Sequence, residues 1–563
     1  MLLTKTNLLD FRQCPRKLWL SLHEPNVASQ RESSHERRAL DGRLVEERAR
    51  ANLVKYQPSG SSTFRWLPAS EDKVADALAA QEAMAKHPSL TFVEVAMHAH
   101  GLYARADALK PNEDGTYALQ ETKASTFPMK KNKEVPDKPD AHHAEDVAIQ
   151  AWVAQESGIE LSSTGLNLLD NRWRYPGDDD YEGLFKVLPM NEHVVELVPQ
   201  VPIWLKQAQD TVAGPMPSCT TGAQCKKPYP CPFVEHCQKL EPAPVEHPIE
   251  LLPDMAGKTL AKKLKAEKGY NSLLQPSPDE FRGAAAELFR RMQQAHATGL
   301  PVRVPGAEHL LKNLPYPRYY FDFEGIDLPV PRWEGVRPYE QMPFQWSCHV
   351  ERAPGVFEHY AFLDVSGEDP SLACMQRLKE VIAQDEGPIL VYYQTYEKGR
   401  LKELAERHPE WSELMNEYIG RLVDLHPLVK DHYYHPKMRG SFSIKKVLPT
   451  IAPDLDYSEL EDVQDGTAAQ LAYLNYCFSP DMTQSERETL RQNMLSYCEQ
   501  DTWAMVEVAY FLEDRGRPGN IRPAPDLLLG QGHAADIHGL HATAVLGFIA
   551  PTVDQEQFED VPL

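Results

Sequence analysis

The chain has 563 residues, too many for one hydrophobic core, so we expect two to four domains. Its 59 Lys and Arg against 82 Asp and Glu give a net charge of -23, which argues weakly against a nucleic-acid partner unless basic residues cluster locally. No stretch approaches the roughly 18 apolar residues of a membrane span, and the first residues lack an apolar leader segment. We therefore expect a cytoplasmic protein with no membrane partner.

Residues 1–240 have the mixed α/β pattern of one domain. Helices are predicted at 8–22 and at 38–54, followed by strand-like runs at 91–110 and 116–125, which the turn PNEDG separates. A Lys-rich loop, PMKKNKEVPDKPD, leads into a further helix at 144–158. This alternation of strands and helices indicates an α/β domain.

Two acids and a lysine lie at the ends of two adjacent predicted strands in this domain. Asp107 stands in ARADAL, and Glu121 and Lys123 stand in LQETKAS, where the two-residue period places both on one face. An Asp and a Glu can hold a divalent metal while a Lys positions a water or steadies a phosphate. A Glu-x-Lys pair is more often a surface ion pair, so its meaning depends on the elements around it.

Four of the nine cysteines are crowded into the end of this domain. Cys219, Cys225, Cys231 and Cys237 are evenly spaced in SCTTGAQCKKPYPCPFVEHC. Clustered thiolates suit zinc or an iron-sulfur cluster, and spacing alone does not separate the two. An odd number of cysteines in a long chain without a leader argues against a disulfide framework.

Residues 241–314 begin with a Pro-rich stretch and continue with amphipathic helices at 255–267 and 278–299, which predicts a helical connector. From 315 to 515, strands at 318–326, 344–353 and 388–393 alternate with helices, which predicts a second α/β domain. Residues 516–563 show no clear period and are expected to form a loosely packed tail.

The second domain opens with the aromatic and acidic run YYFDFEG. In a strand, Phe321 and Phe323 would point into a core while Asp322 and Glu324 share the opposite face. Two like charges side by side are unfavourable unless a cation lies between them, and a divalent metal is the usual one. The run therefore predicts half of a metal site.

Further acids are available to complete such a site. Tyr497 and Asp501 are four residues apart on one face of a late helix, where Asp501 could bind metal and Tyr497 could orient water. Glu397 lies where an apolar strand gives way to a helix, and Asp424 in RLVDLHPL is an alternative. Together these residues predict a metal site built from several carboxylates.

This order of motifs resembles the DEDD exonucleases of the RNase H-like superfamily, in the DnaQ-like group whose last motif carries Tyr. The resemblance covers residues 315–515 and implies a 3'-to-5' exonuclease with Tyr497 near the attacking water. It implies that two Mg²⁺ or Mn²⁺ ions are held by Asp322, Glu324, Glu397 and Asp501. The middle motif of that family normally ends in Asp, whereas this chain has Gln-Thr-Tyr-Glu.

The first domain resembles the PD-(D/E)XK nucleases, specifically the RecB-like branch. The resemblance implies that Asp107 and Glu121 bind metal and that Lys123 is the catalytic lysine. The remaining counterparts are Glu46 as the acid of the first motif, with Glu47 and His35 as alternatives, and Gln150 as the glutamine after the core.

One RecB-like branch, which includes CRISPR-associated adaptation nucleases and AddB-type helicase-nucleases, holds a [4Fe-4S] cluster with one Cys before the nuclease core and three after it. Cys14, in FRQCPRKLWL, resembles the first ligand, and Cys225, Cys231 and Cys237 resemble the other three. Cys219 is the alternative to Cys14, and zinc is the alternative cofactor. Such a cluster would join the start of the domain to its end in a structural role.

The combination resembles a family of bacterial two-domain nucleases. It implies an α/β fold with a restriction-endonuclease-like PD-(D/E)XK domain, a helical connector and an RNase H-like DEDD exonuclease domain. The implied function is metal-dependent hydrolysis of DNA in end processing during repair, recombination or phage defence. Three alternatives stay open: only one domain cuts and the other grips the substrate, RNA is the substrate, or the protein is an inactive metal-stapled scaffold.

Binding of DNA ends or single strands is expected in grooves lined by Lys-rich segments. The two candidate segments are MKKNK at 129–133 and IKK at 444–446. Lys445 and Lys446 could contact the nucleic-acid backbone, with a solvated helix face as the alternative. Binding through such contacts should weaken with salt.

Overall fold

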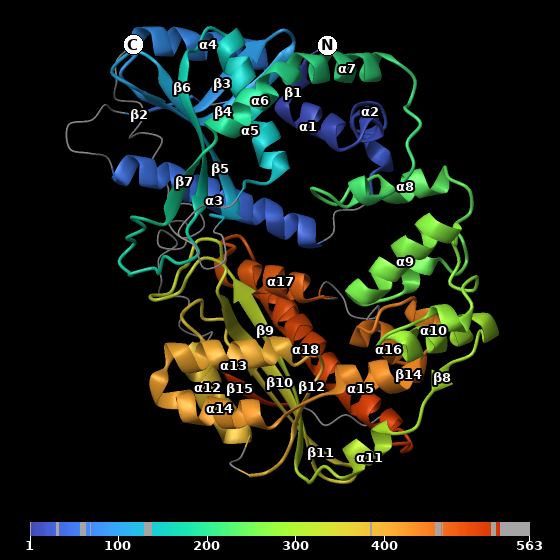
Figure 1. Ribbon diagram of the computed structural model, residues 1–563. Coiled ribbons are helices and arrows are strands. Elements are labelled where there is room, and N and C mark those ends of the chain that lie inside the picture. The colour runs from blue at the N-terminus through green and yellow to red at the C-terminus, as the bar shows by residue number, and fades with distance from the viewer. Residues whose placement is uncertain are drawn as a thin grey trace. The chain divides into compact units, whose positions relative to one another are not determined.

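The computed structural model describes residues 2–29, 33–56, 64–67, 69–128, 138–382, 385–455, 463, 465–518 and 525–529 (Figure 1). The chain divides into two compact units, of which unit 1 contains Met1–Pro242 and Leu328–Glu340, and unit 2 contains Ala243–Asp327 and Gln341–Ala542. The segment MKKNK and most of the expected tail lie outside the described residues. Both units are mixed α/β, as the sequence predicts. Among the helices that are described, none is long and apolar enough to cross a membrane.

Unit 1 is built on a seven-stranded sheet of mixed direction, in the order β2-β3-β4-β5-β6-β7, with β1 pairing with β4. Its strands are β1 (Leu3–Thr4), β2 (Phe64–Trp66), β3 (Thr91–Ala99), β4 (Leu102–Pro111), β5 (Tyr117–Thr126), β6 (Leu161–Leu169) and β7 (Phe185–Pro189). The predicted run at 91–110 is two antiparallel strands, because His100 and Gly101 both have positive φ, at 50° and 79°, and form a two-residue hairpin turn.

Two strands, β1 and β5, pair with different parts of the same edge of β4, and we call this arrangement a fork. β1 pairs with β4 at Leu102 and Tyr103, whereas β5 pairs with it over Ala108–Pro111. Because β3 occupies the opposite edge of β4, β1 and β5 must share this one. Between them the carboxylate of Asp107 accepts a hydrogen bond of 2.6 Å from the backbone N–H of Thr122. The fork therefore brings the first residues of the chain beside Asp107.

Helices cover both sides of the unit 1 sheet, and α5, whose middle is almost entirely buried, lies at the centre of the main core. The helices of this unit are α1 (Lys5–Gln13), α2 (Pro15–His23), α3 (Ser33–Lys55), α4 (Lys73–Lys86), α5 (Ala141–Glu156), α6 (Asn191–Leu197), α7 (Val201–Ala213) and α8 (Val234–Lys239). Helices α1 and α2 are separated at Cys14, whose extended backbone and following Pro15 end the first helix and start the second.

Unit 2 is built on a six-stranded sheet in the order β13-β12-β9-β10-β11-β15. Its strands are β9 (Arg318–Asp327), β10 (Gln341–Ala353), β11 (Val356–Leu363), β12 (Ile389–Val391), β13 (Leu422–Asp424) and β15 (Pro525–Leu529). β9, β10 and β11 form an antiparallel meander, and β12 runs parallel to β9. Two short strands, β8 (Val302–Arg303) and β14 (Tyr433–Tyr434), pair separately.

Helices lie on both faces of this sheet (Figure 1). On one face are α12 (Ser371–Val381), α13 (Thr395–Arg407) and α14 (Ser412–Gly420). On the other face lies α18 (Gln484–Leu512), with 29 residues the longest helix described, together with α15 (Leu425–His432) and α16 (Ile444–Ile451). Helix α17 (Gly466–Phe478) packs against α18 and β9.

The side chains of β9 alternate as its sequence predicts. Phe321 and Phe323 are buried in the core beneath α12, α13 and α14, with their ring centroids 4.5 Å apart. Tyr320 belongs to the core on the opposite face, under α18. Asp322 and Glu324 therefore share that opposite face, and the expected alternation of side chains along YYFDFEG is confirmed.

The helical segment expected to be a connector packs into unit 2. Its helices are α9 (Asp254–Lys268), α10 (Ala286–Thr298) and α11 (Ala307–Lys312). Leu264 and Phe289, from the first two of these helices, are buried in the same hydrophobic cluster as Tyr320 and Trp503. The amphipathic pattern correctly predicts helices here, and their apolar faces are buried in a cluster shared with the second domain.

Candidate metal centres

Three carboxylates converge on one face of the unit 2 sheet. Asp322 and Glu324 from β9 and Asp501 from α18 each offer a ligand oxygen, and these oxygens all lie within 4.8 Å of one another. Glu397, in the first turn of α13, is hydrogen-bonded through its side chain to Asp322. The structure thus brings together all four acids that the sequence singled out for this site.

The fold explains why these acids meet. Strand β12 runs parallel to β9 and ends at Val391, so the start of α13 lies near the carboxyl end of β9, where Asp322 and Glu324 are found. Helix α18 contacts β9 and β10 along the face that carries the two acids. Asp501 is 7% exposed on the buried side of this helix.

Burial and mutual repulsion make these carboxyl groups weak acids in the metal-free protein. Burial, and then the charge of Asp501, raises the pKa of Glu324 to about 8. Burial also raises the pKa of Glu397 to about 8. The pKa of Asp322 lies well above its usual range because it is buried beside the other three acids. Each group would ionise readily only if positive charge entered the site.

The residues present fit a divalent cation. Glu397 is 2% exposed, and within the described part of the chain its Oε2 atom is buried with no hydrogen-bond partner. Oxygen ligands from four carboxylates are the donors that Mg²⁺ and Mn²⁺ prefer. The donor set, the unpartnered oxygen and the raised pKa values all point to a cation site.

Tyr497 and Lys445 contact each other beside the acids. The Lys445 ammonium donates a hydrogen bond of 3.0 Å to the Tyr497 hydroxyl and lies 4.7 Å from the centroid of its ring. Lys445 also counteracts the rise in the pKa of Glu324, so its charge acts on the acid cluster. Lys446 is exposed. Of the two lysines, only Lys445 is placed within the site.

Asp424, the alternative to Glu397, has a different position. Its carboxylate accepts hydrogen bonds from the backbone N–H groups of Tyr393, Gln394 and His426, at 2.9, 3.1 and 3.0 Å. It therefore caps α15 and fastens the loop that leads into α13.

Sequence reasoning missed a further acid near this site. Asp465 is the N-cap of α17, where its carboxylate accepts a hydrogen bond of 2.8 Å from the backbone N–H of Ala468. Its charge contributes to the raised pKa of Glu324. The Asp-Gly pair at the start of this helix predicts an N-cap, but it does not predict that Asp465 lies close to β9.

The unit 1 acids lie around two lysines. Lys123 contacts Glu121 at 2.7 Å and Asp146 on α5 at 2.6 Å. Lys5, the first residue of α1, contacts the same two carboxylates, each at 2.8 Å. Asp107 adjoins this group through the fork in the sheet. Asp107, Glu121 and Lys123 of the predicted set are thus found together. Asp146 and Lys5, which were not predicted, complete the cluster.

The charges of this cluster are strongly coupled. The pKa of Asp107 is well above its usual value because the group is buried and lies close to Glu121. Burial alone would raise the pKa of Asp146, but the charges of Lys123 and Lys5 outweigh burial and lower it. Burial disfavours the charged form of Lys123, yet the surrounding carboxylates raise its pKa well above normal. Both lysines are therefore ammonium groups.

Glu121 offers an oxygen that could bind a cation. Glu121 is 2% exposed, and both lysines contact its Oε1, whereas its Oε2 is buried with no hydrogen-bond partner among the described residues. Asp107 and Glu121 therefore fit a divalent ion. The two ammonium groups already compensate much of the negative charge, which weakens the attraction for a metal relative to the unit 2 site.

The other predicted residues of unit 1 lie at the edge of this cluster. Loss of hydration raises the pKa of Glu46 on α3. The charges of Lys123 and Glu121 also act on this group, although its side chain is exposed. Burial likewise raises the pKa of Glu47, but the charges that act on it are those of arginines, so the structure favours Glu46 over Glu47. Gln150 lies fully buried on α5.

Gln150 acts on the cluster through Asp146. Its side-chain amide donates a hydrogen bond of 2.9 Å to the Asp146 carboxylate, four residues earlier on the same helix. The spacing of Asp146 and Gln150 was a readable signal for a shared helical face. No sequence signal predicts the role of Lys5, because it stands at an ordinary helix start and its partners are distant in the sequence.

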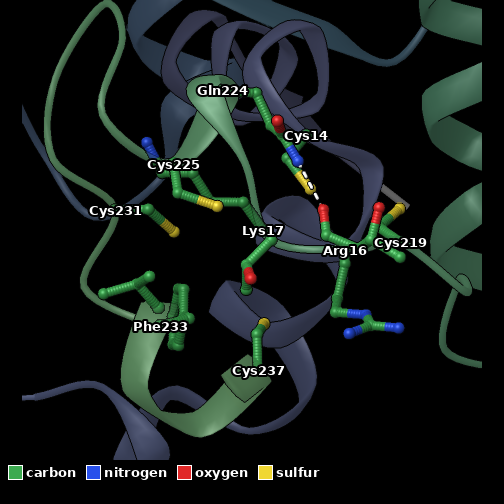
Figure 2. A pocket seen from close by; sticks show the side chains of 12 residues that line it. Cys14, Arg16, Lys17, Cys219, Gln224, Cys225, Cys231, Phe233 and Cys237 are labelled. Atoms are coloured by element: carbon green, nitrogen blue, oxygen red, sulfur yellow. Dashed lines mark hydrogen bonds between the residues drawn. The ribbon is translucent and has the colours of Figure 1, made fainter. Parts of the chain in front are cut away.

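Five cysteines line a single pocket in unit 1. Figure 2 shows Cys14, Cys219, Cys225, Cys231 and Cys237 around it, between the α1–α2 junction and the segment that ends in α8. Hydrogen bonds from α1 and α2 hold that segment in place; the Gln13 amide donates to the carbonyls of Gln224 and Tyr229 at 2.8 and 2.7 Å. The start of the unit is thereby joined to its end.

The thiols of the pocket interact electrostatically with one another. Burial raises the pKa of Cys231 and of Cys237, and both thiols also respond to Cys14 and Cys225. Cys14 interacts in turn with Cys219, so Cys14 contacts both Cys219 and the charges of Cys231 and Cys237.

The spacing of these sulfur atoms bears on the cofactor. Zinc with four thiolates at about 2.3 Å draws the sulfurs into one tight group. Among the described residues, the groups of ligand atoms that lie within 4.8 Å of one another do not include the cysteines. The soft, all-thiolate lining of the pocket suits either an iron-sulfur cluster or zinc.

Comparison with known proteins places part of this chain beside other sequences. The family model described as "Domain of unknown function (DUF2779)" matches residues 319–443, which include Asp322, Glu324 and Glu397. "Uncharacterized protein UU173" of Ureaplasma parvum is 28% identical over 228 residues, which cover 37% of this chain and 33% of that protein.

"Uncharacterized protein MG366 homolog" of Mycoplasma pneumoniae is 27% identical over 224 residues, covering 35% of this chain and 32% of that protein. The chain thus spans about a third of the length of these curated relatives. A solved structure described as "Crystal structure of SSO0001" has a TM-score of 0.20 and 14% identity, covering 43% of this chain and 87% of that one. The residues matched by the family model begin in β9 and extend past α15, and they include three of the unit 2 acids.

Proposed function

We propose that this protein is a metal-dependent nuclease whose unit 2 hydrolyses phosphodiester bonds from a 3' end, as a DnaQ-like DEDD exonuclease of RNase H-like fold. The observation that carries the proposal is the convergence of Asp322, Glu324 and Asp501 within 4.8 Å, with Glu397 hydrogen-bonded to Asp322. Three separate elements contribute these acids. Stability does not explain such a gathering, since carboxylates that lie close together in a buried site repel one another.

The acids and their neighbours have distinct tasks in this reaction. Divalent ions bound by the four carboxylates would lower the pKa of the attacking water and stabilise the leaving oxygen. The Tyr497 hydroxyl, held by Lys445, can orient that water. The Lys445 ammonium can also approach a phosphate oxygen of the substrate. Phe321 and Phe323 fix β9 from its other face, which keeps Asp322 and Glu324 in position.

We propose DNA as the substrate, in end processing. With a net charge of -23, most of the protein repels a polyanion, so contact is restricted to the neighbourhood of Lys445 and similar residues. Hydrolysis at such a site neither requires nor forbids a 2'-hydroxyl, so RNA is tested beside DNA.

Unit 1 we propose to be a RecB-like PD-(D/E)XK nuclease with a [4Fe-4S] cluster. The proximity of Asp107, Glu121 and Lys123 supports this assignment, as does the pocket of cysteines. Cys14, Cys225, Cys231 and Cys237 would hold the cluster, whose role is to fasten α1 and α2 to the end of the unit.

A second candidate is that unit 1 binds DNA and only unit 2 cuts it. The observation that favours this alternative is the double contact of Lys5 and Lys123 with Glu121 and Asp146. Two ammonium groups occupy space and offset charge where a metal would bind.

One experiment tests these assignments. DNA labelled separately at each end, and RNA of the same sequence, are incubated with anaerobically purified protein and Mn²⁺. Wild type is compared with Asp322→Ala, Lys123→Ala and the control Glu488→Gln, an exposed residue of α18. We expect Asp322→Ala to abolish stepwise shortening from the 3' end while Glu488→Gln leaves it unchanged.

The two variants also separate the candidates. If Lys123→Ala removes a second cleavage pattern, unit 1 is a nuclease; if it weakens only DNA binding, unit 1 grips the substrate. Unchanged 3' shortening by Asp322→Ala would refute the assignment of unit 2.

A further inference from the structure

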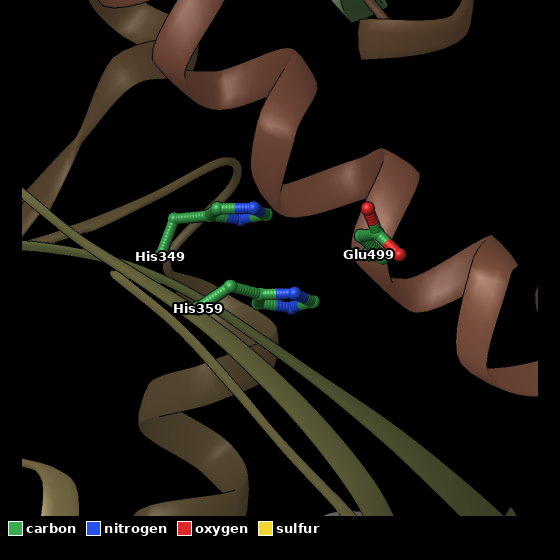
Figure 3. Close-up of side chains that lie close together, drawn as sticks. All are labelled: His349, His359 and Glu499. Atoms are coloured by element: carbon green, nitrogen blue, oxygen red, sulfur yellow. The ribbon is translucent and has the colours of Figure 1, made fainter. Parts of the chain in front are cut away.

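Two histidines and a glutamate form a second group of ligand atoms in unit 2. His349 on β10 and His359 on β11 are paired directly in the register of the antiparallel sheet, and Glu499 lies opposite them on α18. One ligand atom from each residue lies within 4.8 Å of the other two. Figure 3 shows the two rings parallel to each other, with the Glu499 carboxylate across from them.

The two imidazole rings are held in defined orientations. Their centroids are 4.1 Å apart and their planes differ by 4°. Nδ1 of His349 is hydrogen-bonded to the Thr502 hydroxyl at 2.9 Å, and Nε2 of His359 to the Ser347 hydroxyl at 2.9 Å. The two hydroxyls are themselves 2.8 Å apart. Metal-binding histidines are usually fixed in this way through the ring nitrogen that does not bind the ion.

The donor set differs in chemistry from the acid cluster. His349 and His359 are 0% and 3% exposed, whereas Glu499 is partly exposed and leaves one side of the group open toward the surface. Two neutral imidazoles and one carboxylate suit Zn²⁺, Fe²⁺ or Co²⁺, and they suit Mg²⁺ poorly.

We propose that His349, His359 and Glu499 bind one transition-metal ion of the zinc class, at a site separate from the carboxylates that would hold Mg²⁺ or Mn²⁺. The ion would use Nε2 of His349 and Nδ1 of His359, the ring nitrogens opposite those that contact the two hydroxyls. One or two water molecules would complete its coordination on the exposed side.

The site would fasten α18 to the sheet beside the acid cluster. Ser347, which holds His359, is paired in register with Asp322, and Thr502, which holds His349, follows Asp501 in the helix. An ion bound between β10, β11 and Glu499 would thus fix the turn of α18 that carries Tyr497 and Asp501. This role is structural and is independent of whether unit 2 hydrolyses DNA.

Co²⁺ titration tests this proposal on the full chain. The protein is titrated with Co²⁺ in the presence of excess Mg²⁺, so that Mg²⁺ fills the carboxylate site. The Co²⁺ absorption spectrum then distinguishes ligation by nitrogen and oxygen from ligation by cysteine thiolates, which gives intense charge-transfer bands. Wild type is compared with His359→Gln, Glu499→Gln and the control Glu488→Gln, a residue of the same helix that is paired with Arg491. Bound Co²⁺ per chain is measured after gel filtration.

We expect wild type and Glu488→Gln to bind one more Co²⁺ per chain than His359→Gln and Glu499→Gln, without a change in the thiolate bands. Zn²⁺ should displace that ion and raise the melting temperature of wild type but not of Glu499→Gln. Because Glu499 is partly exposed, Glu499→Gln should fold even if His359→Gln does not. Equal Co²⁺ binding by wild type and Glu499→Gln would overturn the proposal.

Discussion

The carboxyl groups of Asp322 and Glu397 are hydrogen-bonded to each other, although one lies on a strand and the other in the first turn of a helix. A carboxylate has no proton to donate, so this bond requires that one of the two groups is protonated. A divalent ion bound at the proposed site would displace this proton.

The first prediction is that the metal-free protein loses stability as pH rises from about 4.5 to about 8. The pKa values of Glu324 and Glu397 are raised to about 8, so the folded state binds protons that the unfolded state has released. Their contribution is largest below the unfolded pKa and is lost as pH rises through the folded one. Thermal unfolding in EDTA across this range measures the loss.

Divalent ions should reverse this trend, since they replace the protons. We expect Mn²⁺ to raise the melting temperature more at pH 9 than at pH 6, and Glu324→Gln to flatten the pH dependence relative to Glu488→Gln. A stabilisation by Mn²⁺ that does not depend on pH would contradict the prediction.

The second prediction concerns the length of the Glu397 side chain. Glu397→Gln keeps the shape but removes the charge, and Glu397→Asp keeps the charge but withdraws the carboxylate from Asp322. Both should lower the rate of 3' shortening by about 10- to 100-fold, as loss of an outer or partial metal ligand does. Single-turnover assays at saturating Mn²⁺ measure this. Full activity of Glu397→Asp would show that the contact with Asp322 is dispensable.

The third prediction distinguishes Cys14 from Cys219. Cys14→Ser should lose the visible absorbance and the iron of anaerobically purified protein, because Cys14 interacts with Cys231 and Cys237. Cys219→Ser should keep both, as should the control Cys477→Ser in unit 2. Iron analysis and absorption spectra decide the matter. Retained iron in Cys14→Ser together with its loss in Cys219→Ser would reverse the assignment.

The fourth prediction is that Lys5 stabilises unit 1. Lys5→Met leaves Glu121 and Asp146 with only Lys123 for compensation and should cost about 3 kcal/mol of unfolding free energy, as is typical when one partner of a buried ion pair is removed. Lys86→Met, which breaks an exposed pair with Glu82, should change stability by less than about 0.5 kcal/mol. Urea unfolding measures both. Mn²⁺ should recover part of the loss in Lys5→Met by binding the uncovered carboxylates.

Local periodicity was sufficient to predict the unit 2 acids. The two-residue alternation in β9 assigns Asp322 and Glu324 to one face, and the four-residue spacing in α18 brings Tyr497 and Asp501 together on one side of the helix. These rules operate within one element, so they hold before any tertiary contact is known. The junction at Glu397 was readable because an apolar strand ends just before it.

What the sequence could not reveal depends on contacts between distant elements. Lys5 reaches Glu121 and Asp146 only because β1 and β5 share an edge of β4, and no local pattern encodes that fork. The histidines were hidden for the same reason, since their proximity depends on the register of β10 with β11. The connector was predicted as helical, but its partner surface lay in another part of the chain.

The cysteine pocket also constrains the order of events during synthesis. One wall carries Cys14 and the other carries residues 219–237, so the pocket does not exist until more than 200 residues separating its walls have left the ribosome. Strand β1 emerges before that interval and β2 to β7 emerge within it, so the unit 1 sheet can pair first, since domains fold largely as their residues appear. A cofactor that binds in this pocket would therefore bind after the unit 1 sheet has formed.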